Sequence, residues 1–510
     1  MKKLARILFI VAVLALVALP TFAQSSTAEP NMLVMARAAD ATGLDPHTQT
    51  AFASFRLLEL IYEPLVNLDA NLNVVPALAE SWEFSSDGLT LTFHLRQNVK
   101  FHDGSPFSSA DVIASFTRIL DPATKDAAAS NYASIKSMEA PDANTVVFHL
   151  SQPDAPILPA LASVNASIVP AAMAKSGDFK ATADGTGPFE LTQWTPDQET
   201  ILTSNKDWWG GAPSFDGIDI RIIPDETSIV AAMRAGTVDF AILNDPTVAT
   251  QLENDSTLQL NKVGSLSYNV LQLNPSRPPM DKLEVRQAIS CAIDRQQVLD
   301  TASLSEGKVT GPITSPAYQI PTSDLFCYTP DLDKAKSLLA QAGESGGFSL
   351  GVIAATTEPP YAEAEAENIQ SQLAQIGITL NIEKLEDSVY VDRWLKGDFD
   401  TAVALNGGRP DPYTMYARYF TNNGNLQVVS NFKDDTIDGL LTQGRAETDP
   451  AKRLDIFTQF QKQITEDSPW IWLYQSYDYT AQQKYVTGFV PNPSDSILSI
   501  AQVKLDKPAS

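Results

Sequence analysis

The residues best suited to chemistry in this chain lie in one loop, NGGRPDPYTMYARYF, at 406–420. The loop follows a run at 399–405 that reads as a strand, and ligands of α/β proteins bind at the carboxyl ends of strands. Arg409 has a planar cation that can hold a carboxylate or another anion bidentately. Asp411 has an anion that can hold an amine. We therefore expect a ligand site here, with an ordinary surface charge as the alternative for Arg409.

The sequence shows no arrangement typical of an enzyme. It has only four histidines, no HExxH and no paired-cysteine spacing, so we expect no metal site. It has no GxSxG elbow and no GxxxxGK[ST] loop for phosphate. We therefore predict a binding protein without catalytic activity and without a cofactor.

The first 23 residues have the pattern of a cleaved signal peptide. Lys2, Lys3 and Arg6 precede an apolar run at 7–19, and Ala23 supplies a small residue at a cleavage site. The apolar run is shorter than the roughly 20 residues needed to span a bilayer. We therefore predict export to the periplasm.

The rest of the chain is long, acidic and poor in cysteine. Cleavage after Ala23 leaves 487 residues (510 − 23), roughly three domains at about 150 residues each. The net charge of −25 becomes −28 without the three cations of the leader (−25 − 3), which argues against nucleic-acid binding. We expect a monomer. Cys291 and Cys327 form either one disulfide or two buried thiols.

Two stretches have the strand and helix order of α/β proteins. The first predicts a strand, a helix and a strand at 217–223, 226–235 and 238–243, and this order implies a parallel pair with a crossover. The second, at 348–405, predicts three strands with helices between them. These stretches place the chain in the α/β class.

A smaller α+β region is expected at 68–186. Apolar residues alternate with polar ones over 89–95, which predicts a half-buried strand. Ser108, with Asp111 three residues later, is expected to cap a helix at 111–120.

The run LAESWEFSSDGLTLTFHLRQNVKFHDGSPFSSADVIASFTRIL at 78–120 resembles the signature region of the family 5 extracellular solute-binding proteins. Further runs match the family in order: LDPHT (44–48), GTGPFEL (185–191), WWGGAPSFDGIDIRIIPDETS (208–228), RQAISCAIDR (286–295) and YTPDLDKAKSLLAQAG (328–343). The resemblance covers essentially the whole chain after the leader. It implies a receptor that closes around a solute and delivers it to the permease of an ABC importer.

The resemblance also implies a fold, a two-lobed periplasmic binding protein with an additional α+β domain. Three domains would surround a ligand cleft, with hinges near 276 and 480. Domain I would comprise 30–66, 187–276 and 481–505, domain II would be 67–186, and domain III would be 277–480.

In peptide-binding relatives, the loop that corresponds to 406–420, after the strand predicted at 399–405, carries an Asp that pairs with the peptide α-amino group. That Asp stands about three residues before an Asp-Pro or Glu-Pro step. Here the step is Asp411-Pro412, and Gly408 stands where the Asp is expected. Either the amine contact is missing or Asp411 has taken it over. Peptide is the leading ligand class, and Gly408 and Asn406 favour an oligosaccharide or another polar solute as the alternative.

The resemblance places four more residues at the cleft. Tyr361, Asp387 and Asn406 align with cleft-lining positions, and Tyr268 lies on a segment of domain I that faces the cleft. Each has an open structural alternative. Tyr361 begins a helix, Asp387 is expected to cap the next helix, and Tyr268 is suited to core packing.

Overall fold

The computed structural model describes residues 30–126, 128–179, 182–356 and 361–507. The predicted signal peptide lies outside these described residues. Within them, we find no helix that combines the length and the apolar character required to cross a membrane.

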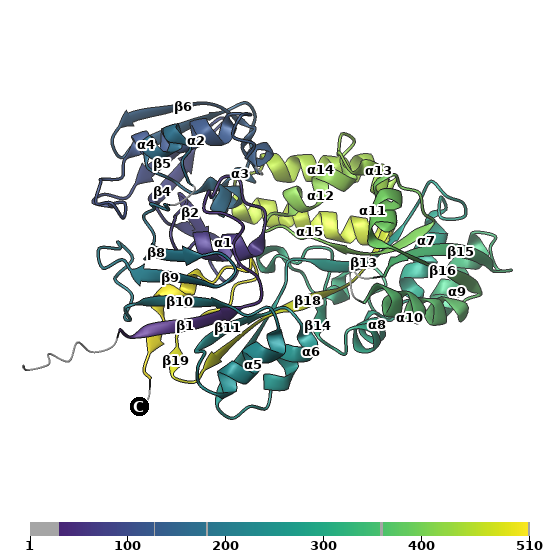
Figure 1. The fold of residues 1–510 in the computed structure, drawn as a ribbon. Helices are drawn as coiled ribbons and strands as arrows, with labels where there is room; N and C mark the ends of the chain where they lie inside the picture. Colours follow the sequence, from purple (N-terminus) through teal and green to yellow (C-terminus); the bar gives the residue numbers. More distant parts are fainter. Residues whose placement is uncertain (1–29, 127, 180–181, 357–360, 508–510) are drawn as a thin grey trace, which may run out of the picture.

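One 12-stranded sheet runs through the molecule (Figure 1). Its strand order is β16-β15-β17-β13-β18-β11-β1-β10-β9-β8, and β12 and β14 also pair with β18. Its strands are β1 (Met32–Arg37), β8 (Phe189–Thr195), β9 (Glu199–Ser204), β10 (Gly217–Ile222), β11 (Phe240–Leu243), β12 (Leu258–Gly264), β13 (Tyr268–Leu273), β14 (Gly307–Val309), β15 (Phe348–Ala355), β16 (Ile378–Leu385), β17 (Thr401–Asn406) and β18 (Trp470–Gln483).

Strand β18 connects two lobes. Its first part pairs with β13 and β14, and its second part pairs with β11 and β12. The other connection is the segment 265–267 between β12 and β13. The two crossings lie side by side, since the Ser265 amide donates to the Ser476 carbonyl over 2.8 Å. Two neighbouring extended segments therefore join the lobes, as in a hinge.

The first predicted α/β unit is present, with one strand inserted. Helix α5 (Glu226–Arg234) follows β10, and Asp225 caps it by accepting from the amides of Thr227 and Ser228. Strands β10 and β11 are not direct partners, because β1 lies between them and is parallel to both. The two strands of the expected parallel pair are therefore separated by β1, which comes from the start of the described chain. The local pattern of residues 217–243 does not predict this insertion.

The predicted α+β region forms its own four-stranded sheet, in the order β4-β5-β7-β6. The predicted helix is present, and the carboxylate of Asp111 accepts from the amide and the hydroxyl of Ser108. The elements are β4 (Ala79–Phe84), β5 (Thr90–Leu95), β6 (Ile135–Asp142), β7 (Thr145–Leu150), α2 (Ser109–Leu120), α3 (Ile157–Ala160) and α4 (Ala171–Ser176).

The second predicted α/β unit is present as expected. Strand β15 lies between β16 and β17 and is parallel to both. The helices of this part are α7 (Leu283–Ala292), α8 (Arg295–Ala302), α9 (Leu332–Gln341), α10 (Ala362–Ala374), α11 (Asp387–Leu395), α12 (Pro412–Phe420), α13 (Gln427–Ser430), α14 (Asp435–Ala446) and α15 (Pro450–Asp467). Cys291 at the end of α7 is bonded to Cys327 across 36 positions of sequence, a loop whose closure contributes about 4 kcal/mol in the chain-entropy model.

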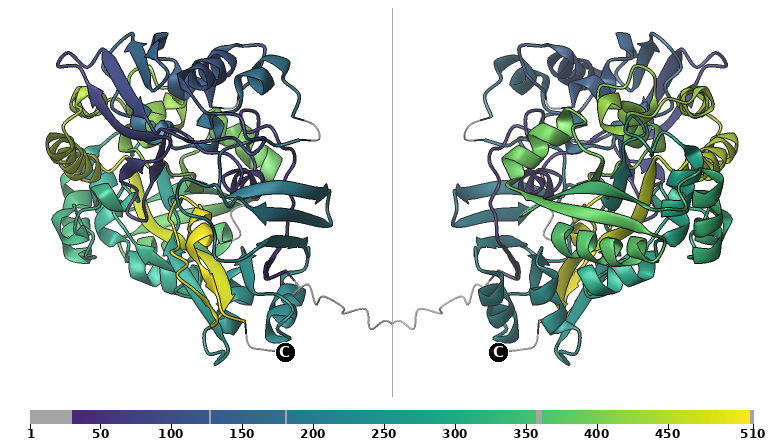
Figure 2. Two further views of the ribbon diagram at one scale, coloured as in Figure 1. Left: turned by 90° about the vertical axis from the view of Figure 1, so that its left-hand side faces the viewer. Right: turned by 90° about the vertical axis from the view of Figure 1, so that its right-hand side faces the viewer.

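The α+β region, drawn in blue, lies at the top of both views in Figure 2. Hydrophobic packing divides the described residues into two bodies. Val169 and Phe179 of predicted domain II pack in one core with Ile218 and Ile220 of domain I, so these two domains share a core. The other body has two cores of its own, and every member of both lies between residues 268 and 474. We call domains I and II together the first lobe, and residues 268–474 the second lobe.

Strand β13 belongs by pairing and packing to the second lobe. It pairs with β17, and its residues Tyr268 and Leu271 pack in the cores of that lobe. Pairing and packing therefore place the first crossing at 265–267. The second crossing lies on β18 between Tyr474 and Tyr479.

Candidate ligand-binding site

Three of the predicted site positions lie at one edge of the sheet. Strands β15, β16 and β17 are parallel, so their carboxyl ends meet at the same edge. Tyr361 precedes the helix after β15, Asp387 begins the helix after β16, and Asn406 ends β17. Asp387 is the first residue of α11, and the cap position belongs to Glu386, which corrects the predicted cap. The side chain of Asp387 lies outside the described part of the structure.

Tyr361 lies near the first lobe. The residue is half-buried, and burial is the main cause that raises the pKa of its phenol. The negative charges of Asp245 and Glu306 raise this pKa further. Asp245 caps α6 (Pro246–Ala249) in the first lobe. The Tyr361 phenol is therefore subject to the charge of a residue in the facing lobe.

Tyr268 and Asn406 form a buried pair beneath this edge. They are direct partners on β13 and β17, and the Asn406 amide donates to the Tyr268 hydroxyl over 3.4 Å. The Tyr268 ring packs at 5.9 Å from the ring of Tyr416. Both Tyr268 and Asn406 are buried. They support the loop that follows β17 and are not exposed on its surface.

Gly408 is at a point of close approach. A Cβ added to Gly408 would lie 1.8 Å from the carbonyl oxygen of Leu266, in the crossing segment 265–267. Real Cβ atoms do not approach a backbone oxygen so closely, because the two atoms would overlap. The backbone here therefore leaves no room for an Asp at 408, and the departure noticed in the sequence has a steric cause.

Asp411 is occupied within the protein. It caps α12 by accepting from the amides of Tyr413 and Thr414, and its other oxygen lies 2.6 Å from Nη1 of Arg453. The side chains of Asp411 and Arg453 are only 2% and 6% exposed. Arg453 also donates to the Tyr318 hydroxyl and to the Gly444 carbonyl. The carboxylate of Asp411 is thus neutralised and buried.

Arg453 is the residue of this region that sequence reasoning missed. Burial alone would lower the pKa of its guanidinium, but the charge and hydrogen bond of Asp411 raise that pKa overall. It lies on α15, far along the chain from the loop, and no spacing or motif pairs the two residues. The sequence around Arg453 shows only an amphipathic helix, and nothing in it indicates that this cation pairs with Asp411.

Arg409 is the exposed charge of the loop. The only hydrogen bond of its guanidinium among the described residues is a long one, 3.5 Å, to the carbonyl of Gly408. No carboxylate of the described chain forms an ion pair with it. Arg409 therefore keeps its donors available.

Polar contacts join the lobes at two further places. At the hinge, Lys262 of β12 lies 2.9 Å from Glu306, and the Tyr479 hydroxyl donates to Glu306 over 2.6 Å. Away from the hinge, Arg445 of α14 lies 3.1 Å from Asp154 in domain II. Polar interfaces of this kind are typical of domains that move relative to each other.

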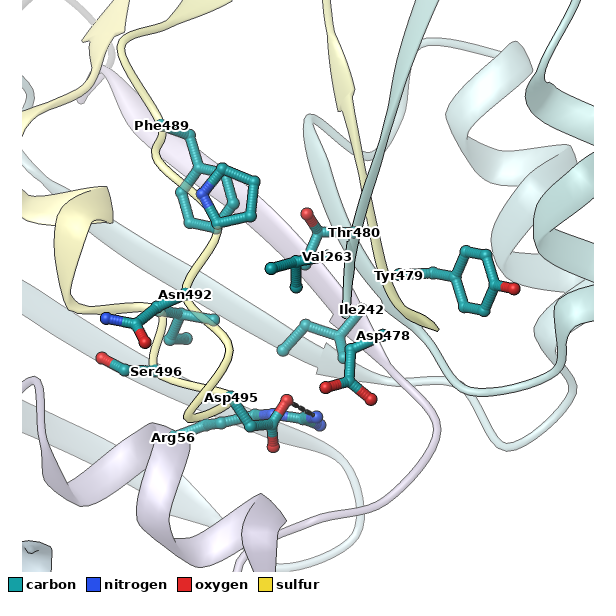
Figure 3. A pocket seen from close by; sticks show the side chains of 12 residues that line it. Arg56, Ile242, Val263, Asp478, Tyr479, Thr480, Phe489, Asn492, Asp495 and Ser496 are labelled. Carbon is teal, nitrogen blue, oxygen red and sulfur yellow. Dashed lines mark hydrogen bonds and ion pairs between the residues drawn. The ribbon is translucent and has the colours of Figure 1, made fainter. Parts of the chain in front are cut away.

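A small pocket lies on the first lobe beside the hinge (Figure 3). Arg56 of α1 (Phe52–Leu58) pairs there with Asp495, and Asp478 of β18 lies next to them. Its volume of about 20 Å³ is close to what one water molecule needs. This pocket is too small for a peptide. Among the residues that the structure describes, no group of His, Cys, Asp and Glu is arranged to hold a metal ion.

The sequence profile of the bacterial extracellular solute-binding proteins, family 5 (middle), matches residues 73–427. The chain belongs to this family. One curated relative is the probable D,D-dipeptide-binding periplasmic protein DdpA of Escherichia coli (strain K12). It is 31% identical to this chain in an alignment over 500 residues that covers 94% of this chain and 95% of DdpA.

Solved structures of family 5 relatives share the fold. The structure of HbpA2 from Haemophilus parasuis has a TM-score of 0.86 and 28% identity, over 94% of this chain and all of that one (100%). The periplasmic binding protein DppA from Helicobacter pylori, in complex with the peptide STSA, has a TM-score of 0.69 and 29% identity, over 93% and 98% of the two chains. The predicted family and the predicted two-lobed α/β fold are confirmed.

Proposed function

We propose that this protein captures small peptides between its lobes by hinge closure and delivers them to the permease of an ABC importer. The separate cores of the two lobes carry the closure step, because no apolar cluster has to be broken when one lobe rotates. The D,D-dipeptide of DdpA and the STSA complex of DppA support peptide as the ligand class.

The lobes of this structure are proposed to be further apart than in a ligand complex. HbpA2 and DppA are almost equally distant in sequence, at 28% and 29% identity, yet their TM-scores are 0.86 and 0.69. Two relatives of similar sequence identity give different TM-scores when their lobes are arranged differently relative to each other. A relative rotation of the lobes in the peptide complex accounts for its lower score.

The predicted site residues divide into two groups in this proposal. Tyr361 and Arg409 line the cleft and touch the ligand, and Asp387 lies at the same sheet edge. Tyr268 and Asn406 hold the loop from beneath. Asp411 stabilises α12, and its charge is already neutralised by Arg453. We therefore do not propose that Asp411 binds the α-amino group of a peptide.

The remaining features of the proposal concern place and partners. After cleavage of residues 1–23 the protein acts in the periplasm as a monomer, binds no nucleic acid and catalyses no reaction. An oligosaccharide or another polar solute is the second candidate ligand, and the absence of a side chain at Gly408 favours it.

Native mass spectrometry of the mature protein, purified from its own periplasm, tests the ligand class. We expect a bound mass that fragments as a peptide. A bound mass that fragments as a glycan would replace the first candidate by the second. The mass of the intact chain in the same sample reports whether cleavage follows Ala23.

A further inference from the structure

Two neighbouring arginines of the second lobe lack counter-charges. Most arginines of the described residues pair with a carboxylate. Arg286 and Arg295 do not, but both are buried and donate to several carbonyl oxygens. Arg409 and Arg418 have no carboxylate partner among the described residues. Arg409 donates to the carbonyl of Gly408, and Arg418 donates to the carbonyl of Gly407 and to the Tyr419 hydroxyl. They are unpaired cations in a protein with a net charge of −25.

The two side chains meet at the same loop. Arg418 is in the last turn of α12, and its Nη2 donates to the carbonyl of Gly407 over 3.2 Å. Gly407 is two residues before Arg409. Partial desolvation by the surrounding protein lowers the pKa of the Arg409 guanidinium, and the positive charge of Arg418 lowers it further.

Arg418 is held in place but is not satisfied. Its guanidinium lies over the ring of Tyr419, 4.6 Å from the ring centre. Its Nε is buried and has no hydrogen-bond partner. A buried donor without an acceptor is costly and calls for an explanation. Two adjacent guanidinium groups without an anion are costly as well, because like charges oppose each other.

We propose that Arg409 and Arg418 together bind a carboxylate group of the ligand at the loop that follows β17. This inference rests on the proposed function and deepens it. A carboxylate between the two guanidinium groups relieves their repulsion and accepts hydrogen bonds from both planar forks. The site lies at the carboxyl end of β17, where Gly407 and Arg409 are exposed.

The assignment reverses the polarity of this loop. Gly408 cannot carry an acidic side chain because of the Leu266 carbonyl, and the carboxylate of Asp411 is neutralised by Arg453. The loop therefore presents cations only. A peptide bound here places its carboxyl end, or an acidic side chain, against the loop, and its amine points elsewhere.

Chemically blocked peptide pools test the assignment. The mature protein, stripped of bound ligand, is incubated with a casein hydrolysate that is untreated, N-acetylated or methyl-esterified, and bound peptides are measured by native mass spectrometry. We expect the esterified pool to give at least tenfold lower occupancy than the untreated pool, because its carboxylates are blocked. Retained occupancy with the esterified pool and loss with the acetylated pool would overturn the assignment.

Variants locate the effect on the two arginines. Arg409→Gln and Arg418→Gln should each lower the occupancy by the untreated pool at least tenfold. Arg221→Gln serves as a matched control, since Arg221 lies on β10 and pairs with Asp219, away from the loop. If Arg418→Gln does not fold, the exposed Arg409→Gln decides alone. Unchanged occupancy in Arg409→Gln would refute the assignment.

Failure of the proposed function can be told apart from failure of this site. If the untreated hydrolysate leaves no bound peptide, peptide capture is refuted, and sodium succinate then serves as the probe. We expect succinate to raise the Tm of the wild type at least twice as much as that of Arg409→Gln, relative to sodium chloride at equal ionic strength. Equal shifts would refute the anion site itself.

Discussion

Two pairs of charged groups meet at the loop after β17, and the protein treats them in opposite ways. Asp411 and Arg453 are an anion and a cation, both buried, with their partners supplied by the fold. Arg409 and Arg418 are two cations at the surface end of the same loop, with no carboxylate supplied among the described residues. The charges of the buried pair balance each other within the fold, whereas the two cations of the other pair have no anion among the described residues.

The difference separates structural charge from binding charge. A buried ion loses hydration, so the fold must compensate it internally. An ion left without compensation is tolerable only where water still reaches it, and there it remains available to a ligand. Variants of the two pairs should therefore differ in what they disturb: stability for Asp411 and Arg453, occupancy for Arg409 and Arg418.

The largest effect is expected for Arg453→Met. This change leaves the Asp411 carboxylate buried without a cation, which typically costs about 3–5 kcal/mol of folding free energy. Urea unfolding of the ligand-free protein measures it. The double variant with Asp411→Asn should recover most of the loss, because Asn still caps α12 and no charge is left unpaired. A single variant as stable as the wild type would show that the pair contributes nothing.

Glu365 shows what happens to a buried carboxyl that has no guanidinium beside it. Burial raises its pKa to about 8, although a hydrogen bond from Tyr474 opposes the shift. The unfolded chain releases this proton near pH 4.5, so between pH 4.5 and 8 the unfolded state binds fewer protons. The contribution of Glu365 to stability is therefore complete below pH 4.5 and declines as the pH rises to about 8.

Unfolding free energies measured between pH 4.5 and 8 test whether Glu365 contributes to stability in this way. Each pH unit of the range corresponds to at most about 1.4 kcal/mol. The fall in stability with rising pH should be smaller in Glu365→Gln than in the wild type. Glu63, whose pKa burial raises to about 7, is unchanged in both proteins and cancels in the comparison. Parallel curves for the two proteins would contradict the role given to Glu365.

Gly408→Ala tests the close approach that excludes an acid from the loop. The added Cβ meets the Leu266 carbonyl at 1.8 Å, and overpacking of this kind costs about 1–3 kcal/mol. Gly407→Ala is the matched control, since nothing lies within 4 Å of a Cβ added there. We expect a lower Tm for the first variant only. Equal Tm values would mean that the loop moves aside freely.

The smallest effect on folding is expected for Arg409→Gln. An exposed arginine without an ion pair contributes within about 0.5 kcal/mol, and loss of its charge relieves the repulsion from Arg418. Urea unfolding should therefore match that of the wild type. A loss above about 1 kcal/mol would place Arg409 with the structural pair instead.

Much of the fold follows from local sequence patterns. Asp225 and Ser108 cap helices as predicted, and the βαβαβ order of 348–405 gives the parallel unit that it predicts. Such features depend on neighbours in sequence. The place of β1 between β10 and β11 depends on residues far apart in the chain, so no local pattern contains it.

The site shows the same limit. Arg409, Tyr361 and Asn406 are at one sheet edge, where their positions after parallel strands predict them to be. The exclusion at Gly408 comes from the carbonyl of Leu266, and the neutralisation of Asp411 comes from Arg453. Both causes are tertiary contacts, which explains why the sequence left the role of Asp411 open.

The shared strand β18 has a consequence for the order in which the two lobes can assemble. All the apolar core of the second lobe lies within one continuous stretch, 268–474. The sheet of the first lobe is complete only when Tyr479–Gln482 pair with β11. As the chain emerges from amino to carboxyl end, the second lobe can fold as a unit while β11 still has an open edge. The first lobe, although it starts first, is finished last.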